Sequence, residues 1–331
     1  MTGITDDRAD AASSSAVQDF ARDFDRLAAN IGQVMKGKPE MIRLVLTCFF
    51  AEGHLLIEDV PGVGKTSVAR ALAASISGSW RRIQFTPDLL PSDVTGVTIF
   101  NQATREFEFH QGGVFANIVV ADEINRASPK TQSALLEVME EGRVTVDGKP
   151  IPVPRPFIVV ATQNPIEMDG TYRLPEAQLD RFLLRIAVGY PDAGAERAIL
   201  NGHRRGTTID ELTPVLDTRR VAGMIADASH VHVADALQDY IVAIAAATRA
   251  LPEAKLGVSP RGSISLMRAS RSRAAADGRA HSIPEDVKAL APSVLAHRLI
   301  LQPEAELRGI TATDLIDRVL AAVPVPRHSA A

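Results

Sequence analysis

The 331-residue chain has little of what marks several large classes of protein. A single cysteine, Cys48, excludes an internal disulfide and fits a reducing compartment. The net charge is only −4 and aromatic residues make up 5%, which indicates neither a strongly basic surface nor a stacking platform for nucleic acid. No apolar run is long enough to span a membrane, and the acidic N-terminus lacks the apolar core of a secretory signal. We therefore expect a soluble, cytoplasmic protein that does not bind nucleic acid.

The apolar patterns divide the chain into an α/β part and a helical part. Residues 1–15 are small, polar and acidic, so we expect a disordered tail. From residue 16 to about 204, short apolar runs alternate with segments of helical spacing, which predicts a central parallel sheet with crossover helices. Residues 205–331 have helical spacing divided by Pro and Gly, which predicts a second, smaller, all-helical domain.

The most informative segment is HLLIEDVPGVGKT, residues 54–66. A short apolar strand, a Gly-containing turn and a helix that begins near Lys65 follow one another, which is the order of a phosphate-binding loop. In such a loop the backbone amides and the helix N-terminus face the phosphates, Lys65 reaches the β- and γ-phosphates, and the Thr66 hydroxyl holds Mg²⁺. The residues predicted to bind the nucleotide here are Pro61, Gly62, Val63, Gly64, Lys65, Thr66 and Ser67. Asp59 stands where the strict pattern has glycine, but Pro61 and Gly62 can form the turn.

A second buried strand, NIVVADE (117–123), ends in two adjacent carboxylates. We expect Asp122 to bind Mg²⁺ together with Thr66, and Glu123 to orient the attacking water and accept its proton. An acidic pair at a strand end can instead cap the following helix. The phosphate loop 57 residues upstream, counted from Lys65 to Asp122, favours the catalytic interpretation.

Two hairpins are predicted within the α/β part. VTIF (97–100) and EFEFH (106–110) flank a polar turn inside an insert at 88–112. RVTVDGKPIPVP contains an Asp147-Gly148 turn signal, so a second hairpin is expected at 143–153, with its proline-rich arm at an edge. An insert as long as the first, inside a crossover, is more often functional than decorative.

Three further side chains are candidates for the site, and each also has a purely structural explanation. Asn164 follows the buried strand FIVVATQ and would lie at the carboxyl edge of the sheet, although Asn-Pro also signals a simple turn. Arg181 lies at a helix end, where an arginine finger would be held rigidly but where the helix dipole alone favours a cation; Arg173 is the runner-up. Arg261 falls in the first turn of a helix, where a cation costs ~0.3–1 kcal/mol, so either a nearby anion or solvent exposure explains it.

Taken in order, these segments resemble the MoxR family of AAA+ ATPases, in the helix-2-insert group. The resemblance extends from about Phe20 to Arg327 and includes an Asp at position 59. The blocks that carry it are LLIEDVPGVGKT, DLLPSDVTG, NQATREFEF, GGVFANIVVADEINRASPKTQSALLEVMEEG, VVATQNPIE, GTYRLPEAQLDRF, SPRGSISLMRA and VPVPR.

The resemblance implies a P-loop AAA+ core with a helical lid, and ATP with Mg²⁺ between them. It implies that Asn164 is the first sensor, that Arg181 is a finger acting on a neighbouring subunit, and that Arg261 is the sensor of the lid. The backbone of Ile31, Gly32 and Gln33 is expected to lie against adenine. The segment 88–112 corresponds to the insert in the second helix, and 143–153 to the hairpin before the first sensor.

Proteins of this family usually form hexameric rings. They hydrolyse ATP and act as chaperone-like machines that remodel or mature client proteins, together with a partner that carries a von Willebrand factor A domain. Two alternatives remain open for this chain. One is a nucleotide-gated switch with little turnover, which an intact Glu123 disfavours. The other is a DNA-acting AAA+ motor, which is disfavoured because the insert hairpin NQATREFEFH has one Arg and no Lys.

Overall fold

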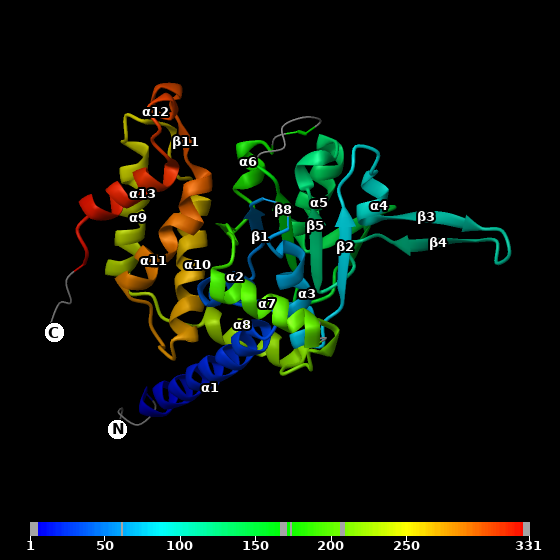
Figure 1. The fold of residues 1–331 in the computed structure, drawn as a ribbon, viewed down its shortest axis with the longest axis horizontal. Coiled ribbons are helices and arrows are strands. Elements are labelled where there is room, and N and C mark those ends of the chain that lie inside the picture. Colours follow the sequence, from blue (N-terminus) through cyan, green and yellow to red (C-terminus); the bar gives the residue numbers. More distant parts are fainter. Residues whose placement is uncertain (1–5, 61, 166–170, 173, 206–208, 327–331) are drawn as a thin grey trace.

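A five-stranded parallel sheet forms the centre of the molecule (Figure 1). The computed structural model describes residues 6–60, 62–165, 171–172, 174–205 and 209–326. The strands, in their order across the sheet, are β2 (Trp80–Gln84), β5 (Ile118–Asp122), β8 (Ile158–Gln163), β1 (Leu55–Glu58) and β9 (Leu184–Ile186). All neighbouring strands pair in parallel, which confirms the predicted sheet.

The inner strands are apolar up to their carboxyl ends, as expected for strands that are covered on both faces of the sheet. Along β5, Ile118 and Val120 belong to one buried cluster, whereas Val119 and Ala121 belong to the cluster on the other face. This alternation is the two-residue period of an extended strand. The apolar run NIVVADE therefore has no polar side until it reaches Asp122 at the carboxyl edge.

Helices surround the sheet and connect its strands. Those of the α/β part are α1 (Asp6–Gly32), α2 (Pro39–Phe50), α3 (Lys65–Ser75), α4 (Pro91–Thr95), η1 (Ile124–Arg126), α5 (Pro129–Glu141), α6 (Glu176–Leu179), α7 (Ala193–Arg205) and η2 (Ile209–Glu211). Helix α5 begins as predicted, with the Ser128 hydroxyl accepting the Thr131 amide and with Pro129 in the first turn.

The N-terminal tail is shorter than predicted, because α1 already begins at Asp6. The prediction of disorder was wrong for residues 6–15; residues 1–5 lie outside the described residues. The segment DDRADAASSSA contains neither Pro nor Gly and includes several alanines, so it extends the helix that the apolar residues from Val17 onward anchor in the core.

Both predicted hairpins are present. The first consists of β3 (Gly96–Asn101) and β4 (Glu106–Gln111), and Figure 1 shows it reaching outward on the side of the sheet away from the helical domain. The second consists of β6 (Arg143–Val146) and β7 (Lys149–Pro152), joined by a turn with positive φ at Asp147 and Gly148. The Thr98 hydroxyl donates to Asp147 Oδ2 at 2.8 Å, so the two hairpins touch.

The C-terminal part is a helical domain, with one addition to the prediction. Its elements are α8 (Thr218–Ser229), α9 (Asp235–Arg249), α10 (Pro260–Ala276), α11 (Pro284–Leu295), η3 (Ala296–Arg298), α12 (Pro303–Leu307) and α13 (Ala312–Ala322), and the strands β10 (Ala254–Leu256) and β11 (Ile300–Leu301). The two strands form a small antiparallel pair. The prediction of helices alone missed it because runs of three and two residues are too short to show a two-residue period.

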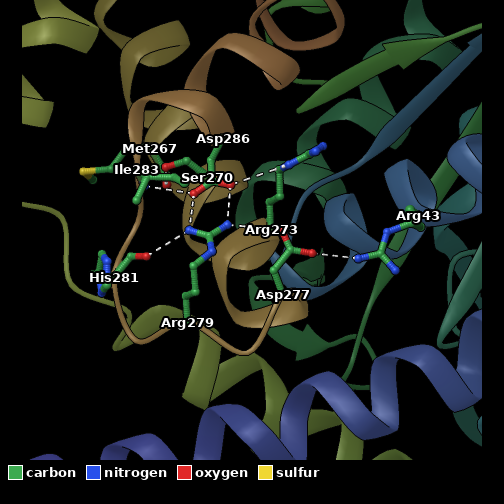
Figure 2. Close-up of polar contacts among 9 residues, drawn as sticks. All are labelled: Arg43, Met267, Ser270, Arg273, Asp277, Arg279, His281, Ile283 and Asp286. Carbon is green, nitrogen blue, oxygen red and sulfur yellow. Dashed lines mark hydrogen bonds and ion pairs between the residues drawn. The ribbon is translucent and has the colours of Figure 1, made fainter. Parts of the chain in front are cut away.

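The helical domain packs against the N-terminal helices without a break in the apolar core. One buried cluster contains Phe24 of α1, Phe49 of α2, Ile57 of the sheet and Leu266 of α10. A polar network follows the same junction (Figure 2): Arg279 pairs bidentately with the buried Asp286, and Arg43 of α2 pairs with Asp277. In the part of the chain that is described, no helix is long and apolar enough to cross a membrane.

Candidate active site

The phosphate loop lies at the carboxyl edge of the sheet, between β1 and α3. Gly62 and Gly64 both have positive φ, at +84° and +92°, which a residue with a side chain rarely adopts. Helix α3 then begins at Lys65, and within the described residues no side chain caps its N-terminus. The first amides of this 11-residue helix and its dipole therefore point toward the loop, as an anion site requires. Pro61 lies outside the described residues.

The structure explains the aspartate at position 59. Its Oδ1 accepts the Val60 amide at 2.7 Å, and its Oδ2 accepts the Gly189 amide at 2.6 Å, just beyond β9. Asp59 thus fixes the start of the loop and attaches it to the neighbouring strand connection. A glycine has no side chain and could accept neither hydrogen bond. The aspartate therefore replaces the conformational freedom of a glycine with two hydrogen bonds that hold the start of the loop.

Lys65 and the two predicted acids share this edge. The Lys65 ammonium donates to the Asp59 carbonyl at 2.6 Å. Burial lowers the pKa of Lys65, while the carboxylates of Asp122, Asp59 and Glu123 act in the opposite direction. The negative charges of the acidic pair therefore reach the lysine, as they must if all three residues serve one triphosphate.

A buried threonine that the sequence did not single out organises the acidic pair. Thr162 of β8 donates its hydroxyl proton to Asp122 Oδ1 at 2.5 Å and accepts the Glu123 amide at 2.9 Å. Glu123 itself has φ of +55°, a left-handed conformation that costs a non-glycine residue roughly 1 kcal/mol or more. The bond from the Glu123 amide to Thr162 holds this strained backbone in place.

Two side chains of β2 complete the surroundings of the acids. Arg82 donates to Asp122 Oδ2 from Nε at 3.0 Å and from Nη2 at 2.6 Å. Gln84 donates to Glu123 Oε2 at 2.8 Å and accepts from Arg82 at 2.7 Å. The sequence contained a signal for both residues: polar side chains two positions apart lie on one face of a strand, and these stand at its carboxyl end.

The donor set suits magnesium bound together with phosphate. Mg²⁺ prefers oxygen ligands and is usually held by one or two carboxylates plus substrate phosphates. Asp122 and the Thr66 hydroxyl in the first turn of α3 are such donors. No group of three or more His, Cys, Asp or Glu able to hold a metal ion by itself is found among the described residues.

The remaining nucleotide-binding candidates lie near the same edge. Asn164 directly follows β8, whose last residue, Gln163, accepts the Asp59 amide at 3.1 Å. Ile31, Gly32 and Gln33 lie at the end of α1; the Ile31 side chain is buried in the core, so only its backbone could face a ligand. The chain after α1 passes close to the phosphate loop. Met35 Cε would lie 3.5 Å from a Cβ atom placed on Gly64.

Arg181 and Arg261 lie at the opposite, amino edge of the sheet. His54, which precedes β1, accepts the Leu183 amide through its carbonyl at 2.8 Å and donates from Nε2 to the Met139 carbonyl at 2.9 Å. Burial lowers the pKa of His54 to about 4, so the ring is neutral and its Nδ1 accepts the Val159 amide. These bonds anchor the segments that carry Arg181 and Glu140 next to the start of β1.

One carboxylate brings the two arginines together. Glu140, in the last turn of α5, pairs with Arg181 at 3.1 Å through Oε2 and with Arg261 through Oε1. Residues Gly53 and His54 line the same cavity of about 380 Å³ as these three. Since the four residues of β1 span roughly 13 Å, the arginines are separated from the phosphate loop of their own subunit by the depth of the sheet. The structure therefore does not bring Arg261 to the phosphate loop, and Arg173 lies outside the described residues.

Comparison with known proteins agrees with this arrangement. The family model described as "ATPase family associated with various cellular activities (AAA)" matches residues 54–184, and the AAA lid domain matches residues 246–319. YeaC of Bacillus subtilis is 51% identical over 297 residues, which are 90% of this chain and 93% of that protein. Chaperone MoxR1 of Mycobacterium tuberculosis is 42% identical over 317 residues, 93% of this chain and 83% of that protein.

The chain belongs to the MoxR family of AAA+ ATPases. A crystal structure of a protein from Cytophaga hutchinsonii, 35% identical, has a TM-score of 0.89 and covers 96% of this chain and 98% of its own. An MCM homologue from Methanopyrus kandleri, 17% identical with a TM-score of 0.56, shows the fold alone. Membership of the MoxR family confirms the predicted AAA+ core, helical lid and ATP hydrolysis.

Proposed function

We propose that this MoxR-family ATPase works as a ring in which one subunit holds the nucleotide and the next supplies the arginines. The observation that carries the proposal is the separation of the two half-sites: Lys65 lies at the carboxyl edge of the sheet and Arg181 at the amino edge. A single subunit cannot bring both to one γ-phosphate, because its sheet lies between them. A head-to-tail contact between copies can, and such contacts close into rings.

The first half-site would bind ATP and activate water. The loop amides and Lys65 hold the phosphates, and Thr66 and Asp122 would hold Mg²⁺, which neutralises developing negative charge. Glu123 accepts the proton of the attacking water, with Gln84 and Thr162 fixing its orientation. Asn164, at the end of β8, would contact the water or the γ-phosphate.

The second half-site would stabilise the transition state from the neighbouring subunit. Arg181 and Arg261 share the carboxylate of Glu140, an acid placed unfavourably at a helix C-terminus and offset there by the two cations. A triphosphate carries more negative charge than Glu140 and attracts both guanidinium groups more strongly. The nucleotide of the neighbouring subunit thereby offers the arginines a more highly charged partner than Glu140.

The work of the ring is proposed to be chaperone-like remodelling of client proteins, with a von Willebrand factor A domain partner. The relative from Mycobacterium tuberculosis bears the name chaperone. The insert hairpin provides a surface for such contacts. Phe107 is 75% exposed, and the ring of Phe100 packs edge-to-face against it with 5.2 Å between the ring centroids. Exposed aromatic side chains on a projecting element are typical of protein-binding sites.

A capture experiment tests this role. The Glu123→Gln variant, loaded with ATP, is expected to retain a client or a von Willebrand factor A domain protein at least about tenfold better than Lys65→Ala, because it binds nucleotide without completing turnover. A second variant, Phe107→Ser, keeps the nucleotide site but removes the exposed ring and should lose the client. Equal capture by all three variants would show that nucleotide does not control client binding.

A further inference from the structure

Arg298 is an unusual residue because its charge is buried. It ends η3 of the helical domain, and its side chain is 2% exposed. Burial lowers the pKa of its guanidinium, and the neighbouring Asp180 carboxylate opposes that shift. A buried cation is tolerated only when it is paired and its N–H groups are satisfied. The partners of Arg298 therefore show what the cation is for.

Arg298 makes four of its hydrogen bonds to the segment that carries Arg181, and it also donates to the Val294 carbonyl and the Ser265 hydroxyl within the helical domain. Arg298 Nε donates to Asp180 Oδ1 at 2.7 Å. Its Nη2 donates to the carbonyls of Phe182 at 2.8 Å and Asp180 at 3.1 Å, and its Nη1 to that of Leu183 at 3.3 Å. The guanidinium thus fixes the main chain on both sides of Arg181.

Two other side chains of the helical domain hold the same segment. His297 donates from Nε2 to the Phe182 carbonyl at 3.0 Å. The Ser259 hydroxyl, just before α10, donates to Asp180 Oδ2 at 3.1 Å. Arg181, in contrast, extends from this fixed main chain toward Glu140 and stays 29% exposed. The helical domain therefore immobilises the base of the arginine and leaves its tip available.

We propose that Arg298, through its ion pair with Asp180, is a positioning residue for Arg181. The proposal rests on the proposed function, in which Arg181 acts on the nucleotide of a neighbouring subunit. Transition-state stabilisation needs the charge within about 1 Å of its target, and misplacement on that scale costs about 100-fold in rate. Anchoring the Asp180 carboxylate and the carbonyls of Asp180, Phe182 and Leu183 to one buried guanidinium provides such accuracy. Arg298 thereby acquires a role in catalysis without touching the nucleotide.

A second buried ion pair in the same domain provides a matched control. Arg279 pairs bidentately with Asp286, which is 2% exposed, and its other described partners are Asp277 and the His281 carbonyl (Figure 2). This pair ties the α10–α11 connection toward α2 and involves no residue of 180–183. If buried ion pairs matter only for folding, Arg279→Lys and Arg298→Lys should have the same consequences.

The kinetic test compares Arg298→Lys, Asp180→Asn and Arg279→Lys. Lysine cannot reproduce the fork of the guanidinium, and asparagine removes the paired charge while keeping hydrogen-bonding atoms. We expect Arg298→Lys and Asp180→Asn to lower kcat for ATP hydrolysis about 10- to 100-fold, with KM changed less than about twofold. Arg279→Lys should leave kcat within about twofold. Equal losses of kcat in all three variants, in proportion to lost thermal stability, would overturn the proposal.

A mixing experiment distinguishes a misplaced Arg181 from a damaged nucleotide site. It uses Asp180→Asn, so it can be done even if Arg298→Lys does not fold. Lys65→Ala subunits have an intact finger but no working phosphate loop. Mixed with Asp180→Asn subunits, they should raise turnover at least about fivefold above either alone, because an intact finger then faces an intact site. The control mixture combines Lys65→Ala with Arg181→Ala subunits. If turnover recovers in this control but not in the mixture with Asp180→Asn, the positioning role is refuted, whereas action of Arg181 between subunits stands. No recovery in the control mixture would refute action between subunits, and the positioning role with it.

Discussion

Replacing Glu123 by glutamine is expected to lower kcat for ATP hydrolysis by about 10³-fold while ATP binding stays nearly unchanged. The substitution keeps the shape of the side chain and an oxygen that can accept the Gln84 bond of 2.8 Å, but it removes the basic carboxylate. The phosphate loop, Lys65 and Asp122 are untouched. Phosphate release measured beside calorimetric binding of ATP checks both halves of the prediction.

The control for this variant is Glu306→Gln, which removes a charge from an exposed acid on α12. It should hydrolyse ATP like the unchanged protein. Ordinary turnover in Glu123→Gln would exclude Glu123 as the base. A matching loss of ATP binding would instead mean that this residue supports the site structurally, through its strained backbone and the bond to Thr162.

Replacing Arg181 by alanine is expected to lower kcat by about 10³-fold or more, with KM for ATP little changed. The arginine lies on the far side of its own sheet from Lys65, so its removal cannot disturb nucleotide binding by the same subunit. Arg181→Lys should also be impaired, because an ammonium group cannot contact two phosphate oxygens in one plane. Steady-state kinetics over a range of ATP concentrations separates kcat from KM.

Arg22→Ala is the matched control, since it removes an exposed arginine whose partner, Asp19, lies on the same helix. It should leave both constants unchanged. A rise in KM for Arg181→Ala with unaltered kcat would assign Arg181 to nucleotide binding rather than to the transition state. Unaltered values for both constants would leave Arg181 as a partner of Glu140 only.

The sequence predicted those parts of the molecule that depend on neighbouring residues. The phosphate loop, the acidic strand end and the Asp147-Gly148 turn each depend on a few consecutive residues. Strand periodicity, glycine at positive φ and helix starts are local properties, so a short segment is enough to predict them. The parallel sheet followed from their alternation. For the same reason the start of α1 was misplaced: its first turns have no apolar pattern to mark them.

What the sequence could not predict depends on contacts between distant segments. Asp59 bonds to Gly189, which is 130 positions away, and this contact explains a residue that looked like a departure from the motif. Thr162 and Arg82 reach Asp122 across strands 40 positions apart. Likewise, the sequence identified Arg181 and Arg261 as candidates from their positions at helix ends. Their shared contact with Glu140 depends on how the helical domain packs against α5.

The central claim, that the catalytic site is completed only between subunits, is tested most directly by the concentration dependence of turnover. ATP hydrolysis per subunit would be measured over a dilution series, with assembly followed by light scattering in the same samples. Turnover per subunit is expected to fall in step with dissociation and to approach the low rate of Arg181→Ala. Constant turnover per subunit in samples that contain only monomers would contradict it.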